Sequence, residues 1–389
     1  DFNSGSYQWQ VITSAIFRDN SAWMHICVAI NTADGTASNR VKIYVNGSQI
    51  TSFSTSNYPS LNYESKVNLN VDHRIGSLSG STTFDLDGYI AEAVLVDGSQ
   101  LDQNSFGEFD EDSNIWKPKD VSGLTFGTNG FYLDFENSGS LGADVSGNGN
   151  NFTVNNLTSI DQSTDTCSTN FATYNPLDNY APASTFAEGN LQITTGGTNI
   201  YSFNNSTIAV SSGKWYAEVK VLTTATDNFN MIGISALSPV YYRSSPWGEL
   251  GDSAYAYAYV GYDGAIRNNN SESSYGASYT TNNIVGIYLD LDNNKLYFSK
   301  DGALQNSGTG ISITAPTSTP TGHYFFSAGN YQNNNAVYSA NFGTPAFAIS
   351  SGNTDDNGYG NFEYSPNITG DGVAKKFYAL NTKNLAEYG

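Results

Sequence analysis

The stretch DLDNNKLYFSKD, residues 290–301, allows two opposite interpretations, and the choice between them decides the fold. Its spacing matches a calcium-binding loop, with oxygen ligands at the first, third, fifth and twelfth places: Asp290, Asp292, Asn294 and Asp301. A helical calcium hand also requires glycine at the sixth place, where this chain has Lys295, and amphipathic helices on both sides. The flanking segments instead alternate with a period of two, as strands do. Because asparagine tolerates the left-handed backbone of a tight turn, the stretch predicts a β-hairpin that turns at Asn293 and Asn294.

The same alternation recurs along the chain, interrupted by turns rich in Gly, Asn, Asp and Ser. In residues 24–30, for example, Met24, Ile26, Val28 and Ile30 share one face of a predicted strand. No long stretch shows the helical period of 3.6 residues. Many short strands separated by turns predict an all-β chain built as two antiparallel β-sandwiches in series.

The periodicity fades between the two runs of predicted strands, and this loss suggests the domain boundaries. We expect a first sandwich over residues 1–157, a linker over 158–185, a second sandwich over 186–348 and a C-terminal tail over 349–389. The tail contains Phe377, Tyr378 and Leu380, whose apolar side chains would attach it to the second sandwich.

The composition excludes several functional classes. The chain has 389 residues with 36 acidic and 16 basic side chains, a net charge of -20, which argues against binding nucleic acid or an anionic membrane surface. No apolar run is long enough to span a bilayer, and no signal peptide is recognisable. The two cysteines, Cys27 and Cys167, and three histidines form no zinc pattern; Cys27 reads as a core residue, and its pairing with Cys167 stays open.

Several segments resemble known families. GKWYAEVKV, MIGIS, the quoted hairpin and FFSAGNY follow one another as in a SPRY domain, whereas SAWMHICVAINT and DGYIAEAVLVDGSQLD resemble a laminin-G-like domain. SFGEFDEDSNIWKPK and GTNGFYLDFENS resemble segments of structural proteins of marine tailed phages. The resemblance implies two concanavalin A-like jelly rolls, the first lacking its N-terminal strands, so we expect a segment of a longer polypeptide.

The same resemblance implies a non-enzymatic structural or adhesive protein on the virion surface, such as a fibre, a decoration or a tail appendage. Its partners would be a host-surface glycan or receptor, other virion proteins and further copies of itself, with no nucleic acid and no membrane insertion. Two alternatives remain open: a purely structural filament or capsid subunit, and a glycan hydrolase of concanavalin fold.

A hydrolase of this fold needs two carboxylates alternating on one strand. Glu108, Asp110 and Asp112 have that spacing, but they stand in a segment with few strand-forming residues, directly before NIWKPK. We therefore interpret them as a solvated acidic loop and expect no catalytic residue and no cofactor other than a calcium ion.

A calcium ion has one candidate site, in the turn-rich segment after residue 133. Asp134, Glu136, Asp144 and Asn148 supply hard oxygen ligands there, and laminin-G-like domains sometimes bind calcium at a rim. The alternative is that Asp and Asn are simply the residues that turns require.

The aromatic loops offer the candidate ligand-binding site. Tyr241, Tyr242, Arg243 and Trp247 lie between turn residues, and with Tyr275 they could stack on a sugar ring and donate hydrogen bonds at a rim of the second sandwich. The neighbouring alternation of Tyr255, Tyr257 and Tyr259 with alanine fits either a binding surface or the core between two sheets.

Overall fold

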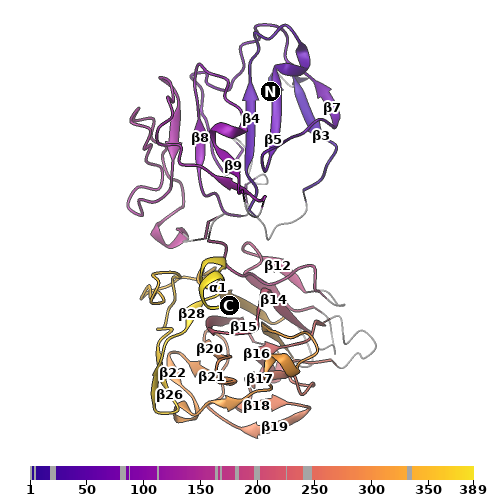
Figure 1. The fold of residues 1–389 in the computed structure, drawn as a ribbon, viewed down its shortest axis with the longest axis vertical. Helices are drawn as coiled ribbons and strands as arrows, with labels where there is room; N and C mark the ends of the chain where they lie inside the picture. The colour runs from indigo at the N-terminus through magenta and orange to yellow at the C-terminus, as the bar shows by residue number, and fades with distance from the viewer. Residues whose placement is uncertain are drawn as a thin grey trace. The chain divides into compact units, whose positions relative to one another are not determined.

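The computed structural model describes all residues except 1, 4–5, 18–22, 79–84, 87, 112–113, 163–164, 167–168, 180–183, 197–201, 225, 240–247 and 331–334 (Figure 1). It divides into two compact units, Asp1–Gln162 and Ser163–Gly389, a division that falls inside the predicted linker. The predicted all-β class is confirmed, since strands dominate both units. Among the described residues, no helix has the length and apolarity needed to cross a membrane.

The first unit contains several small antiparallel sheets. The pairs, with their bounds, are β1 (Phe2–Asn3) with β2 (Ser6–Tyr7), β3 (Gln10–Thr13) with β7 (Phe53–Asn57), β8 (Ala93–Leu95) with β11 (Phe131–Leu133), and β9 (Gly107–Phe109) with β10 (Trp116–Pro118). A three-stranded sheet joins β4 (Ile26–Ile30), β5 (Val41–Val45) and β6 (Ser48–Gln49). The short 3-10 helices of this unit are η1 (Ala37–Asn39), η2 (Gln103–Ser105) and η3 (Ser159–Asp161).

Strand β4 buries its small residues and exposes its large ones. Cys27 and Ala29 pack with Tyr44 in a small core, and burial raises the pKa of the Cys27 thiol to about 11. The predicted core reading of Cys27 is therefore confirmed, while Cys167 lies outside the described residues. On the opposite face, Ile26 and Val28 are 63% and 51% exposed.

The second unit has two larger sheets (Figure 1). We call the first the tail-side sheet. Its strands run in the order β12 (Thr185–Ala187), β13 (Gln192–Thr194), β25 (Val337–Asn341), β15 (Lys214–Thr223), β20 (Ile284–Asp290), β21 (Lys295–Lys300) and β22 (Ala303–Leu304). In addition, β23 (Ile311–Ser312) pairs with β21, and β28 (Tyr378–Ala379) pairs with β15. The second, the open-side sheet, runs β14 (Ser202–Val210), β24 (Tyr324–Asn330), β16 (Asn230–Ser235), β17 (Ala256–Val260), β18 (Ala265–Asn268) and β19 (Ser271–Ser274). The remaining elements are η4 (Thr226–Asn228), η6 (Asn306–Gly308), η7 (Pro316–Ser318), the hairpin of β26 (Ile368–Gly370) and β27 (Val373–Lys375), and α1 (Thr382–Tyr388).

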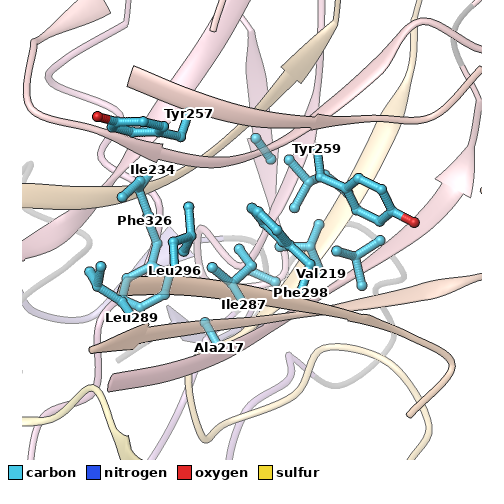
Figure 2. Close-up of a cluster of buried hydrophobic side chains, with 14 of the residues drawn as sticks. Ala217, Val219, Ile234, Tyr257, Tyr259, Ile287, Leu289, Leu296, Phe298 and Phe326 are labelled. Carbon is cyan, nitrogen blue, oxygen red and sulfur yellow. The ribbon is translucent and has the colours of Figure 1, made fainter. Parts of the chain in front are cut away.

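The core lies between these two sheets, where alternate residues of facing strands meet. Figure 2 shows Tyr257, Tyr259, Ile234 and Phe326 of the open-side sheet gathered with Ile287, Leu289, Phe298 and other residues of the tail-side sheet. Tyr257 and Tyr259 are buried and Tyr255 packs against the same cluster, so the core interpretation of this tyrosine alternation is the correct one.

The quoted stretch is the hairpin of β20 and β21, as predicted. Asp290 pairs with Lys295 and Ile287 with Phe298 across the two strands, and Asn294 takes the left-handed backbone at the turn, with a φ of 50°. The carboxylate of Asp290 is fully buried, accepts from the Asn293 backbone N–H at 3.1 Å and faces the Lys375 ammonium at 3.0 Å.

The C-terminal residues cover the outer face of the tail-side sheet. Phe362 and Phe377 pack on Tyr216, Tyr288 and Tyr297 in a second buried cluster. Strand β28 pairs in parallel with β15, while Leu380 enters the main core. The tail thus attaches through Phe377, Tyr378 and Leu380, the residues that the sequence singled out.

The predicted linker is only partly a linker. Phe171, Ala172 and Tyr174 are almost completely buried in the second unit, and Phe171 forms a β-bridge with Asn381. Their irregular spacing hid this burial, because an isolated bridge has no alternation that could be recognised in the sequence.

Glu218 connects the tail to β15. Its fully buried carboxylate accepts four hydrogen bonds, from the backbone N–H groups of Glu363 and Tyr364, the Asn341 amide and the Tyr216 hydroxyl, at 2.7–3.1 Å. Burial raises the pKa of Glu218 from 4.5 to about 7. The four donors favour the ionised form and so lower this pKa, but the effect of burial is larger.

This raised pKa predicts a pH-dependent stability. A carboxyl group whose folded pKa lies above its unfolded value stabilises the fold below pH 4.5, and this stabilisation is lost as the pH rises through about 7. We expect the free energy of unfolding to fall by about 3 kcal/mol between pH 4.5 and 8 relative to Glu218→Gln, whose side chain does not titrate. Urea unfolding of both proteins across this range measures the difference; parallel pH profiles would show that Glu218 does not titrate there.

Candidate functional site

The open-side sheet carries a surface hollow of about 240 Å³, which we call the Arg267 hollow. Its wall is formed by Phe229, Met231, Tyr262, Arg267 and Glu272. Phe229 directly precedes β16 and Met231 belongs to it, Tyr262 lies in the turn after β17, and Arg267 and Glu272 belong to β18 and β19. Four strands that are consecutive in the sheet, β16 to β19, therefore fix its shape.

Arg267 is held by carboxylates on all sides. Its guanidinium forms ion pairs with Asp252 and Glu272 at 3.2 Å each and a closer one with the almost fully buried Glu249. Burial raises the pKa of Glu249, whereas the attraction of Arg267 lowers it. Asp252 and Glu272 add further negative charge around the guanidinium.

The aromatic part of the hollow is fixed as well. The rings of Phe229 and Tyr262 meet edge to face with centroids 4.9 Å apart, and the Tyr262 hydroxyl donates to Glu272 at 2.8 Å. This hydrogen bond raises the pKa of Tyr262. Tyr262 nevertheless remains 39% exposed, so it presents a rigid aromatic surface to solvent.

A larger hollow of about 530 Å³ lies at the tip of the β20–β21 hairpin, and we call it the lysine groove. Its lining residues come from the start of β15, the hairpin turn and the tail: Gly213, Lys214, Asp292, Asn293, Val373, Ala374, Lys375, Lys376, Tyr378 and Tyr388. The rings of Tyr378 and Tyr388 are stacked, with centroids 3.9 Å apart.

Four of the predicted ligand-binding residues, Tyr241, Tyr242, Arg243 and Trp247, lie outside the described residues. The fifth, Tyr275, was wrongly placed on a rim. It is buried beside Tyr259 and Phe298, and its hydroxyl accepts from the Phe298 backbone N–H at 3.1 Å. It is a core residue because β17 and β21 enclose it from both sheets.

The predicted calcium ligands serve mainly as turn residues. Asp144 accepts backbone N–H groups of Tyr132, Ser146 and Asn150, and the Asn148 amide donates to two backbone carbonyls. Asp134 accepts from the backbone of Glu136. Within the described part of the chain, no group of three or more His, Cys, Asp or Glu side chains is placed to hold a metal ion. Calcium binding stays a prediction of the sequence.

Of the acidic residues considered for hydrolysis, Glu108 lies on strand β9 rather than in a loop, whereas Asp110 follows the end of that strand. Lys117 lies 3.7 Å from Glu108 and 3.1 Å from Asp110, and Lys119 lies 3.4 Å from Glu108. Asp112 is outside the described residues. Both described carboxylates therefore have lysine partners, Lys117 of the adjoining strand β10 and Lys119 just after it.

Neither hollow was predicted from the sequence. Arg267 stands alone in the segment AIRNN, and its partners Glu249 and Asp252 lie before strand β17, on the other side of that strand in the sequence. The paired lysines of KKFYAL were visible in the tail, but the hairpin tip that completes the groove is distant in sequence.

A family model for the SPRY domain matches residues 214–344, which belong to the second unit. Ran-binding protein 9 of Danio rerio is 28% identical over 143 residues, which are 36% of this chain and 22% of that protein, and Ran-binding protein 10 of the same organism is 27% identical over 143 residues, 36% of this chain and 21% of that protein. The chain thus spans about a fifth of the length of these curated relatives. The crystal structure of the SPRY domain of human HERC1 is 14% identical, with a TM-score of 0.32, and the match covers 43% of this chain and 96% of that one.

Proposed function

We propose that this chain is a non-enzymatic binding protein whose SPRY domain holds a protein partner at the Arg267 hollow. The hollow lies within the SPRY-matched residues, and its wall combines Phe, Met, Tyr and Arg, the side-chain types that are enriched where proteins meet. The single observation that carries the proposal is the rigid, exposed Tyr262 beside the carboxylate-held Arg267.

Pre-organisation is what makes this surface suited to binding. Tyr262 and Arg267 share Glu272 as a hydrogen-bond acceptor, so neither side chain has to be ordered when a partner arrives. The entropy cost of fixing a flexible side chain, about 0.5–1.5 kcal/mol each, is thereby avoided.

The resemblance to phage proteins suggests where this binding would take place. On a virion surface, the partner would be a host receptor or a neighbouring virion subunit, and several copies of the chain would present several hollows at once. Multivalency would then turn weak single contacts into stable attachment.

A purely structural filament or capsid subunit is the second candidate, favoured by the exposed Ile26 and Val28 on β4. In that case, association between copies would depend on these two residues. Substitution of Tyr262 would not change this association.

The proposal is tested with peptides selected against the intact chain from a random 12-residue library. We expect Tyr262→Ala to weaken the binding of the selected peptides by more than tenfold, because it removes the exposed aromatic anchor. Tyr7→Ala, which alters an exposed tyrosine of the first unit, should leave the affinity unchanged. Fluorescence anisotropy measures both, with thermal melting as a check on folding. Full affinity of a folded Tyr262→Ala protein for every selected peptide would refute the proposal.

A further inference from the structure

The lysine groove is formed mainly by residues of the C-terminal tail. Six of its ten lining residues belong to residues 373–388, beyond the SPRY-matched range, and they line it together with Asp292 and Asn293 of the β20–β21 turn. The groove is therefore a feature of this chain that the SPRY match does not contain, and it is separate from the Arg267 hollow.

The lining gathers three lysines in a chain whose net charge is -20. Lys214, Lys375 and Lys376 line the groove together with the carboxylate of Asp292. Each ammonium group has a carboxylate partner: Lys375 faces the fully buried Asp290, Lys214 faces Asp292, and Lys376 faces Asp356 outside the lining. An anionic group entering the groove would therefore replace one of the exposed partners, Asp292 or Asp356.

Two of these ammonium groups can be redirected towards a ligand. The Lys376 side chain is 66% exposed and pairs at the surface with Asp356, and Lys214 pairs with the half-exposed Asp292. Ion pairs near the surface contribute little to stability, so exchanging one carboxylate partner for another costs little. Lys375 is different, because it is 12% exposed and held 3.0 Å from Asp290.

The groove also contains a pair of stacked aromatic rings. Tyr378 and Tyr388 stack with an angle of 14° between their planes, and Asp292 and Asn293 approach from the hairpin turn. Aromatic faces contact the apolar face of a sugar ring, while carboxylate and amide groups bond its hydroxyls. The volume of about 530 Å³ lies within the range of small-molecule sites, about 300–1,000 Å³.

We propose that the lysine groove binds a sugar residue that carries a carboxylate, with Lys376 and Lys214 facing the carboxylate and the tyrosine pair contacting the ring. This combination distinguishes an acidic sugar from a simple anion, which would not use the tyrosines, and from a neutral sugar, which would not use the lysines.

Titration of the full chain with D-glucuronate, followed by saturation-transfer difference NMR, tests the proposal. We expect glucuronate to bind at least tenfold more tightly than D-glucose or acetate, and Lys376→Gln to weaken it by about tenfold. The matched control is Lys383→Gln, an exposed lysine of α1 that does not line the groove and whose loss should leave binding unchanged.

Several results would overturn the proposal. One is the absence of glucuronate binding, and another is equally tight binding of acetate. A third is tighter binding of N-acetylglutamate amide, which carries a carboxylate without a sugar ring. The last is an equal effect of the Lys376 and Lys383 changes on glucuronate binding. Tyr388→Phe, which keeps the ring, should retain binding, whereas a folded Tyr388→Ala protein should lose most of it. None of these outcomes depends on the Arg267 hollow.

Discussion

Replacing Glu218 by alanine is expected to destabilise the second unit by about 3–5 kcal/mol, because it removes one charged acceptor shared by four donors. The backbone N–H groups of Glu363 and Tyr364 and the Asn341 amide would remain buried without their acceptor. The tail would lose its main polar connection to β15, so residues near 363 should open before the sheets separate.

Equilibrium urea unfolding measures the loss of stability, and amide hydrogen exchange at Glu363 and Tyr364 locates it. Glu218→Gln is the matched control, since it keeps the volume and one acceptor oxygen and should cost less than Glu218→Ala. A loss below about 1 kcal/mol in Glu218→Ala, with both amides still protected, would mean that the tail is held by its apolar contacts alone.

Phe298→Ala is expected to destabilise the same unit by about 3–5 kcal/mol, the usual cost of truncating a buried phenylalanine. The Phe298 ring is fully buried and lies 5.3 Å from the ring of Tyr259 and 5.9 Å from that of Tyr275, measured between centroids. Removing it leaves a cavity between the sheets and takes away two aromatic contacts at once.

Phe298→Leu is the control, because it retains most of the volume and should cost distinctly less. Thermal and urea unfolding measure both variants, and the near-ultraviolet circular dichroism of the tyrosines reports on the ring packing. Equal stability of the alanine and leucine variants would show that the cavity collapses without cost and that the ring contacts contribute little.

The β20–β21 hairpin could be predicted from the sequence because everything that determines it is local. The alternation of Ile287 and Leu289 with polar or aromatic neighbours, the asparagine turn and the missing sixth-place glycine all lie within one short segment. The attachment of the tail was predictable for a similar reason, since Phe377 and Leu380 are the type of side chains that must be buried.

The site residues were harder to predict, because their roles depend on contacts between distant segments. Nothing in the sequence near Tyr275 shows that β17 and β21 enclose it. Nor does the sequence around Arg267 reveal Glu249 as its buried partner. Asp144 has the chemistry of a calcium ligand, and only its three backbone N–H donors show that it organises a turn.

The parallel pairing of β28 with β15 affects the order in which the strands of the second unit can pair during folding. Glu218 and Tyr364, which hydrogen-bond beside this pairing, are separated by 146 residues along the chain. During synthesis β15 leaves the ribosome long before its last neighbour exists, so Tyr216, Tyr288 and Tyr297 stay uncovered while most of the sandwich is already made. Closing so long a loop is slow compared with forming the β20–β21 hairpin. The nascent domain therefore passes through an interval with an exposed aromatic sheet face, the kind of surface that promotes aggregation.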